Sequence, residues 1–216
     1  MSRLAVGTSA NAHILAELDL SHDVIKSAIE QTYKLLDRID ATLVDAGVFP
    51  LSQTVELANL SSMIGNIFGA AIAQHSNGLF KRNGPHKYPD LLSTEPLKRP
   101  NIEIKMALEN NKPKGHLAKP GYYITCRYVL CFEDGSFVLD KANRGITPCI
   151  WEVRCGRLDE EHFNISNTEG DSGKTAVVNA EGMKALKVIY VDLEKAPLSR
   201  KGSIFRQYAS MVADGL

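Results

Sequence analysis

The stretch YPDLLSTEPLKRPNIEIKMAL, residues 88–108, holds the pattern that decides how this chain folds. Its last seven residues, IEIKMAL, begin with alternating apolar and charged side chains, which is the period of a β-strand with two different faces. The apolar side chains therefore point to one face, and Glu103 and Lys105 point to the other. The two charged groups are neighbours, roughly 6 to 7 Å apart along the strand.

A second carboxylate precedes this strand, in the pair Pro89-Asp90, with twelve residues between Asp90 and Glu103. Those twelve residues let the chain return, so that a strand holding Asp90 can pair with the strand holding Glu103. Two carboxylates are hard oxygen ligands for Mg²⁺, which keeps several waters and usually takes one or two protein carboxylates plus substrate phosphate. Lys105 beside them offsets their mutual repulsion and can contact the attacking water or the charge on a phosphate.

The pattern Pro89-Asp90, twelve residues, Glu103-Ile104-Lys105 resembles the PD-(D/E)xK nuclease superfamily, whose best-known members are type II restriction endonucleases. The resemblance covers the motif and a compatible order of elements across residues 50–195. It implies an α/β fold, a restriction-endonuclease-like mixed β-sheet flanked by helices. It further implies that Asp90, Glu103 and the backbone of Ile104 bind Mg²⁺, and that Lys105 is the catalytic base or positions the water.

An acidic residue from a neighbouring helix is a further candidate. A helix is expected over residues 52–76, because Leu60, Met63 and Ile67 form one continuous apolar stripe. Glu56 lies on that stripe, so it is expected to face inward, where an unpaired charge is costly. Many family members bring such a carboxylate toward the metal. The alternative is that Glu56 lies in the first helical turn, is favoured there by the helix dipole, and reaches solvent.

Candidate DNA contacts follow the motif strand. A polar, basic connection there suits phosphate contacts that position a duplex without reading its sequence. It contains Asn110, Asn111, Lys112, Lys114, Gly115, His116 and Lys119. Arginine is the usual bidentate partner of guanine, so the candidate base readers further on are Asn143, Arg144, Arg154 and Arg157. The alternative for each is a solvated surface side chain.

The order of expected elements is helices, several strands, a short helix, a strand and a final helix, which is an α/β pattern. Helices are expected over 22–44, 52–76, 180–186 and after Pro197, and strands over 86–92, 101–109, 121–132, 136–140, 147–157, 162–166 and 187–193. Glu133 to Ser136 supplies a hairpin turn. We expect one nuclease domain over 1–216, with a helical part over 1–50, a catalytic core over 51–195 and a helical segment over 196–216.

Bulk properties fit an ordinary globular protein. The chain has 216 residues, 44% apolar, with a formal net charge of zero, but nine Lys/Arg against four Asp/Glu gather in residues 81–119. The chain contains no run of about 18 apolar residues that could cross a bilayer. The four cysteines form no CxxC pair, and buried free thiols are expected, with Cys126 and Cys131 on opposite faces of a strand. We expect a soluble protein without membrane contact, in the cytoplasm of a prokaryote.

The function expected is that of a Mg²⁺-dependent endodeoxyribonuclease acting on double-stranded DNA. Cutting both strands of a symmetric site asks for a two-fold homodimer. Other nucleases of the superfamily, such as a resolvase, a repair nuclease or a transposon-end nuclease, and a non-catalytic DNA-binding module remain alternatives. So does nucleotide binding through GDSGKT with Gly173-Lys174-Thr175, although Thr168 stands where a P-loop requires glycine.

Overall fold

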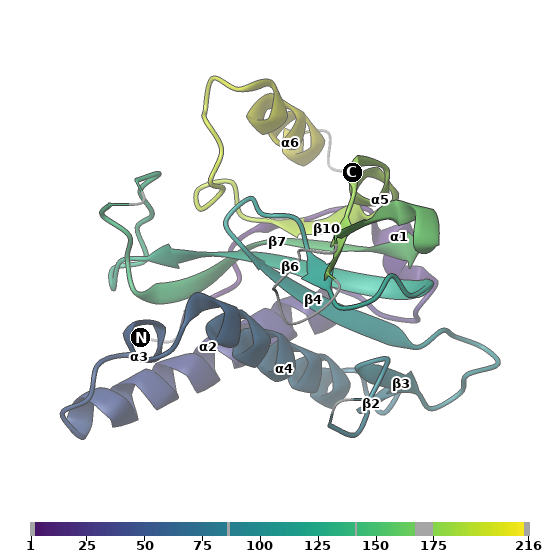
Figure 1. Ribbon diagram of the computed structural model, residues 1–216, viewed down its shortest axis with the longest axis horizontal. Helices are drawn as coiled ribbons and strands as arrows, with labels where there is room; N and C mark the ends of the chain where they lie inside the picture. The colour runs from purple at the N-terminus through teal and green to yellow at the C-terminus, as the bar shows by residue number, and fades with distance from the viewer. Residues whose placement is uncertain (1–2, 86, 141, 167–174, 214–216) are drawn as a thin grey trace.

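The computed structural model describes residues 3–85, 87–140, 142–166 and 175–213. Seven strands form one mixed sheet in the order β1-β10-β7-β6-β4-β3-β2 (Figure 1). Neighbours in this sheet are antiparallel except β4 and β6, which are parallel. The strands are β1 (Thr8–Ser9), β2 (Phe80–Arg82), β3 (Leu91–Ser93), β4 (Ile102–Leu108), β6 (Gly121–Cys131), β7 (Thr147–Leu158) and β10 (Lys187–Val191). The chain therefore has the α/β class that the order of elements predicts.

Helices cover both faces of this sheet (Figure 1). The long helices α2 (His22–Asp45) and α4 (Leu57–His75) lie on one face, with the short α3 (Leu51–Thr54) beside them, and α5 (Ala180–Ala185) and α6 (Ser203–Ala213) lie on the other. The short α1 (Ala12–Ala16) precedes α2. None of the helices within the described ranges combines the length and the apolar character needed to cross a bilayer.

The main core lies between α2, α4 and the sheet. Phe68 and Ile72 of α4 and Ile104 of β4 belong to one buried cluster. Glycines on α4 let β4 approach closely, because a Cβ on Gly65 would lie 2.9 Å from the Met106 Cγ. The apolar face of IEIKMAL therefore packs on α4, and its charged face points away from that helix.

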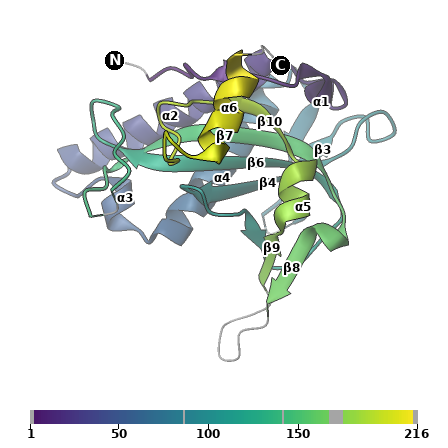
Figure 2. The ribbon, with the colours of Figure 1, turned by 90° about the horizontal axis from the view of Figure 1, so that it is seen from above.

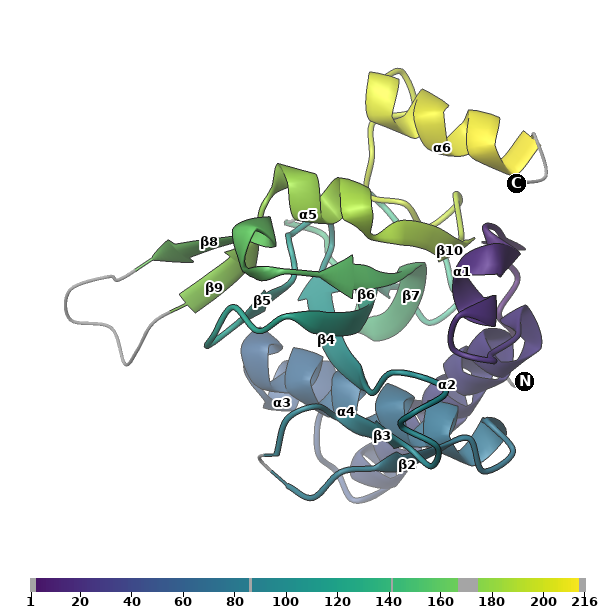
Figure 3. The same ribbon diagram turned by 90° about the vertical axis from the view of Figure 1, so that its right-hand side faces the viewer.

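A second, three-stranded sheet extends from the body with the order β5-β9-β8 (Figures 2 and 3). Its strands are β5 (Lys114–Gly115), β9 (Thr175–Val178) and β8 (Phe163–Ser166), all antiparallel to their neighbours. The hairpin of β8 and β9 projects beyond the main sheet (Figure 3). The short β5 joins it to the segment that directly follows β4.

Most predicted elements are confirmed, with shifted ends. The helix over 22–44 is α2, and the strands over 101–109, 121–132, 147–157, 162–166 and 187–193 are β4, β6, β7, β8 and β10. The single helix over 52–76 is wrong, because Val55 and Glu56 are extended and separate α3 from α4. The strand over 136–140 is also wrong: the chain turns at Gly135, whose φ is 82°, and β6 pairs with β7 instead.

The cysteine prediction is confirmed. All four thiols are free and buried. Cys126 belongs to the core under α2 and α4, whereas Cys131 belongs to the separate cluster that packs against α6. An offset of five residues along β6 places them on opposite faces.

Candidate functional site

The pairing of β3 with β4 places Asp90 beside Glu103. Leu91 is the antiparallel partner of Ile102, so the residue before Leu91 lies opposite the residue after Ile102. The backbone N–H of Asp90 donates to Glu103 Oε2 at 3.2 Å, and the backbone N–H of Ile104 donates to Asp90 Oδ2 at 2.8 Å. The two carboxylates thus share one small region at the end of β3.

Glu103 lies in a confined environment. Its side chain is 10% exposed, and its Oε1 accepts a hydrogen bond from the Lys105 ammonium. Burial raises the pKa of the Glu103 carboxyl above its ordinary value, the Lys105 charge opposes this rise, and the Asp90 charge adds to it. Two charges of opposite sign therefore stabilise each other where a lone carboxylate would be unfavourable.

Tyr88 lies near the two carboxylates, since the charges of both act on its hydroxyl. Its hydroxyl donates to the Pro120 carbonyl at 3.0 Å, which ties the segment before Asp90 to the start of β6. Burial raises the pKa of Tyr88, and the charges of Glu103 and Asp90 raise it further. The carboxylates thus lie where β3 meets β4, near a tyrosine that is hydrogen-bonded to the residue before β6.

The edge of β4 is open beyond its first residue. β3 pairs with β4 at Ile102 alone, so over the described residues no strand pairs with that edge along 104–108. A cavity of about 950 Å³ runs along it and is lined by all five residues of that stretch, together with Asp90. Backbone groups and side chains of β4 are therefore both presented to whatever enters the cavity.

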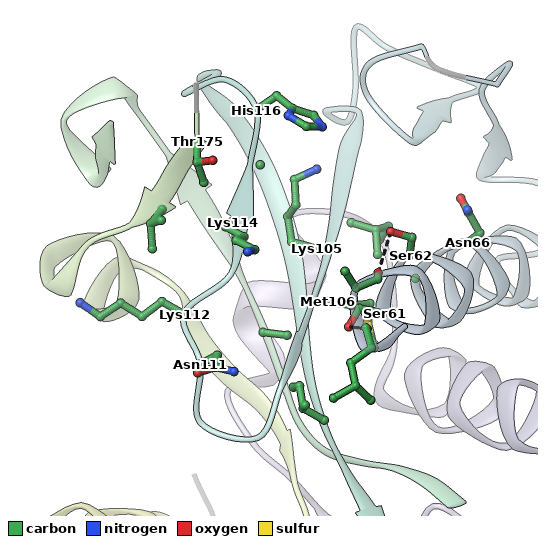
Figure 4. Close-up of a pocket in the computed structure, with 18 of the residues that line it drawn as sticks. Ser61, Ser62, Asn66, Lys105, Met106, Asn111, Lys112, Lys114, His116 and Thr175 are labelled. Atoms are coloured by element: carbon green, nitrogen blue, oxygen red, sulfur yellow. Dashed lines mark hydrogen bonds between the residues drawn. The ribbon is translucent and has the colours of Figure 1, made fainter. Parts of the chain in front are cut away.

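Two walls enclose the cavity (Figure 4). Helix α4 contributes Ser61, Ser62 and Asn66 on one side. The segment around β5 contributes the opposite wall, with Asn111, Lys112, Lys114 and His116, and Thr175 and Val177 of β9 stand behind it. One wall is polar and uncharged, the other is basic, and Lys105 extends between them (Figure 4). Such a lining suits an anionic chain.

The strand β5 lies directly against Lys105. A Cβ on Gly115 would be 3.2 Å from Lys105 Cε and 3.8 Å from its Nζ. Glycine at this position leaves the room in which the lysine side chain extends toward the cavity.

The oxygen donors fit Mg²⁺. Asp90 and Glu103 supply two carboxylates, and the Ile104 carbonyl points to the same edge as the Ile104 N–H, because both groups of a strand residue face one neighbour. Within the described ranges no group of three His, Cys, Asp or Glu side chains could hold a metal. Two carboxylates, one carbonyl and waters suit Mg²⁺, whereas Zn²⁺ sites generally need more nitrogen or sulfur ligands. The Lys105 ammonium pairs with Glu103 beside these donors.

The inward position predicted for Glu56 is wrong. Glu56 is exposed and is the N-cap residue of α4, with extended backbone and without a side-chain capping bond. The break between α3 and α4 removes it from the apolar stripe, and it does not line the cavity. The structure instead has the Glu56 side chain in solvent, as the alternative interpretation predicted.

The predicted DNA contacts lie in different places. Lys112 and Lys114 are exposed on the basic wall of the cavity, whereas Lys119 lies over the ring of Tyr88, with its Nζ 4.2 Å from the centroid. Asn143 is exposed and donates to Asp140 at 2.8 Å. These residues do not form one patch, since only the first two share the cavity.

The arginines among the predicted base readers make contacts within the protein. Arg144 donates to Glu109 at 2.7 Å, and the exposed Arg157 donates to Asp159 at 3.1 Å. Arg154 is turned inward, with 16% of its side chain exposed. It donates to Glu152 at 2.7 Å, to the Tyr208 hydroxyl, and to two backbone carbonyls near α5. A guanidinium so engaged has little capacity left for a base edge.

Sequence reasoning missed the wall from α4. The signal was present, because Ser61, Ser62 and Asn66 recur at helical spacing beside Gly65. Their proximity to β4 depends on packing, which local periodicity does not report. His116 stood within the predicted polar connection, but its place opposite α4 comes from the pairing of β5 with β9.

Residues 170–174 of GDSGKT, with Gly173 and Lys174, lie outside the described ranges, and Thr175 lines the cavity. Searches of protein-family models and of curated proteins found no match to this chain.

Proposed function

We propose that this protein is a Mg²⁺-dependent endodeoxyribonuclease of the PD-(D/E)xK type that cuts a specific double-stranded site, as type II restriction endonucleases do. One observation carries the proposal: Asp90, Glu103 and Lys105 are linked by hydrogen bonds across β3 and β4 beside a basic cavity. The mixed sheet with helices on both faces supports the restriction-endonuclease-like fold.

Each residue of the group has a distinct part in phosphodiester hydrolysis. Asp90, Glu103 and the Ile104 carbonyl would hold Mg²⁺, which when bound neutralises charge on the phosphate and lowers the pKa of water. The Ile104 N–H keeps the Asp90 carboxylate oriented. Lys105, released from its pair with Glu103, orients the attacking water toward phosphorus and stabilises the added negative charge.

The basic wall fits the flanking phosphates. Lys112 and Lys114 are exposed, line the same cavity as Lys105, and bind backbone phosphates without reading sequence. Within this proposal Lys119, Asn143, Arg144 and Arg157 remain candidates for contacts outside the cavity. A homodimer on double-stranded DNA completes the proposal, because a two-fold site requires two such centres.

Plasmid cleavage tests the proposal. We expect nicking and linearisation of supercoiled DNA with Mg²⁺, no cutting with EDTA, and a loss of at least about 100-fold in rate for Lys105→Ala. Lys98→Ala is the matched control, because Lys98 is exposed and lies outside the cavity.

Two results would contradict the proposal. If Lys105→Ala cut DNA at the wild-type rate, the group of Asp90, Glu103 and Lys105 would not be the catalytic site. If the wild-type protein bound DNA but showed no metal-dependent cutting, it would be a non-catalytic DNA-binding module. The same basic wall could make its DNA contacts.

A further inference from the structure

His116 lies at the mouth of the cavity that holds Lys105. It is exposed, directly follows β5, and lines the same cavity as Asp90 and Lys105. Figure 4 shows the Lys105 amine extending toward the part of the cavity where the His116 imidazole lies. We infer that His116 is a further catalytic residue, the general acid that protonates the 3′ oxygen leaving from phosphorus. This inference rests on the proposed nuclease function.

The position of His116 relative to the other groups follows from the contact of β5 with β4. A Cβ on Gly115 would lie 3.8 Å from Lys105 Nζ, and neighbouring Cα atoms are about 3.8 Å apart. The Cα of His116 therefore lies no more than roughly 9 Å from Lys105 Nζ, which is the sum of these two distances and one Cα–Cβ bond. Lys105 is partly buried and joined to Glu103 below it, whereas His116 stands at the exposed rim.

This arrangement matches in-line displacement. The attacking water approaches phosphorus from one side, and the leaving oxygen departs on the opposite side. Asp90 and Lys105 line the side of the cavity next to Glu103, which pairs with Lys105, and the water is held there. A phosphate seated between them and the rim directs its leaving oxygen outward, within reach of the imidazole.

The lining offers few other proton donors suited to this task. Among the described residues of the cavity wall, His116 is the one imidazole, and the remaining side-chain donors are lysines, hydroxyls and amides. Histidine is the side chain that most often serves as a general acid or base near neutral pH. The polar wall of α4 carries hydroxyl and amide groups that can hold the phosphate oxygens but are weak acids.

The step balances as follows. The water oxygen, which Lys105 orients, forms a bond to phosphorus and loses its proton to solvent. At the same time the bond from phosphorus to the 3′ oxygen breaks. The electron pair of that bond stays on the 3′ oxygen, which takes the proton from the His116 imidazolium. The products are a 5′ phosphate and a 3′ hydroxyl, and the neutral imidazole regains its proton from solvent.

A sulfur-bridged substrate tests this role. The duplex carries a 3′-bridging phosphorothiolate at the scissile bond, once the cleavage position has been mapped on ordinary DNA. A thiolate leaves without protonation, since thiols are far stronger acids than alcohols. We expect His116→Ala to cut ordinary DNA about 100-fold to 10,000-fold more slowly than the wild type, and to cut the sulfur substrate within a few-fold of the wild-type rate.

Matched variants separate this role from others. His13→Ala, at an exposed histidine of α1 outside the cavity, is expected to cut both substrates normally. An equal loss for His116→Ala on both substrates would make His116 a phosphate contact and overturn the inference, and so would normal cutting of ordinary DNA. In both cases wild-type cleavage leaves the proposed function standing, whereas a wild-type protein that cuts neither substrate overturns both.

Discussion

The site concentrates unfavourable charge in one side chain. Glu103 is 8% exposed and lies next to the Asp90 carboxylate, and the ammonium of Lys105 only partly relieves it. A residue whose charge is disfavoured by the fold reduces stability, and such residues are common where a ligand or ion is bound. The charge of Glu103 therefore lowers the stability of the free protein, although the proposed binding of Mg²⁺ requires that charge.

Replacement of Glu103 is expected to stabilise the free protein at neutral pH. The pKa of Glu103 is raised above the ordinary value of 4.5, so the folded state holds this proton more tightly than the unfolded state. Below pH 4.5 the carboxyl is protonated in both states and has no cost. The cost appears as pH rises through the folded pKa and persists above it.

We therefore expect Glu103→Gln to gain about 1 kcal/mol in unfolding free energy at pH 7, and to lose this advantage below pH 4.5. Denaturant unfolding at several pH values measures it, with the exposed Glu160→Gln as the control. A destabilised Glu103→Gln protein at pH 7 would show that the pair with Lys105 outweighs burial.

Gly115 is expected to affect cleavage indirectly, by leaving room for the Lys105 side chain. Valine at this position would push against Lys105 Cε, because even a Cβ would lie 3.2 Å from it. Misplacement of a reacting group by about 1 Å can cost 100-fold in rate, and we expect a loss of about that size for Gly115→Val in plasmid cleavage.

The double variant with Lys105→Ala discriminates between mechanisms. If Gly115 acts only by making room for the lysine, Gly115→Val should cost nothing further once the lysine is gone. An additional loss in the double variant would assign β5 a separate contact with DNA.

At the scale of elements, α2 is attached to the sheet at a bulge in β7. The register shifts between Arg127 and Tyr128 of β6, so that Trp151 is the extra residue on β7. Tyr33 of α2 satisfies the backbone there: its hydroxyl donates to the Ile150 carbonyl at 3.2 Å and accepts from the Ile150 N–H at 2.8 Å. Burial raises the pKa of Tyr33 strongly.

Tyr33→Phe should therefore be costly. It leaves a buried N–H and a buried C=O at the bulge without that partner, and an unsatisfied buried group costs about 1 to 3 kcal/mol. We expect a loss of about 2 kcal/mol in urea unfolding with little change in m-value. A loss below about 0.5 kcal/mol would mean that water or a shifted backbone replaces the hydroxyl.

At the scale of the whole molecule, charge is distributed unevenly although its sum is zero. The cavity gathers Lys105, Lys112 and Lys114, whereas Arg127 and Arg154 are paired with Glu152 inside the fold. Net charge therefore says little about DNA binding in this protein, and the arrangement of the cations that line the cavity says more.

Salt dependence of DNA binding measures which cations meet phosphate. Each phosphate contact adds about 0.9 to the slope of log K against log salt. We expect Lys112→Ala and Lys114→Ala each to reduce the slope by about that amount, measured by fluorescence anisotropy in EDTA so that the duplex stays intact.

Lys184→Ala is the control, because Lys184 on α5 is exposed and pairs with Glu181 outside the cavity. An equal reduction by Lys184→Ala would show that the duplex lies across α5, away from the cavity of Lys105.

Local pattern determined much of this protein. The alternation in residues 102–108 predicted the two faces of β4, and the apolar period predicted α2, because both depend on neighbours within a few residues. The spacing of Asp90 and Glu103 likewise indicated two carboxylates that could meet. Pairing of β3 with β4 was the simplest return for the chain between them, and the structure contains it.

The surroundings of that pair depend on long-range packing. Glu56 faces solvent because α4 begins after it, Arg154 is turned inward because α5 and α6 supply its partners, and β5 reaches Lys105 because a distant strand, β9, holds it. These outcomes depend on contacts between segments far apart in the chain, which residue periodicity does not encode. Local alternation thus predicts the strand that carries the charged groups, whereas contacts between distant segments select the side chains that share its cavity.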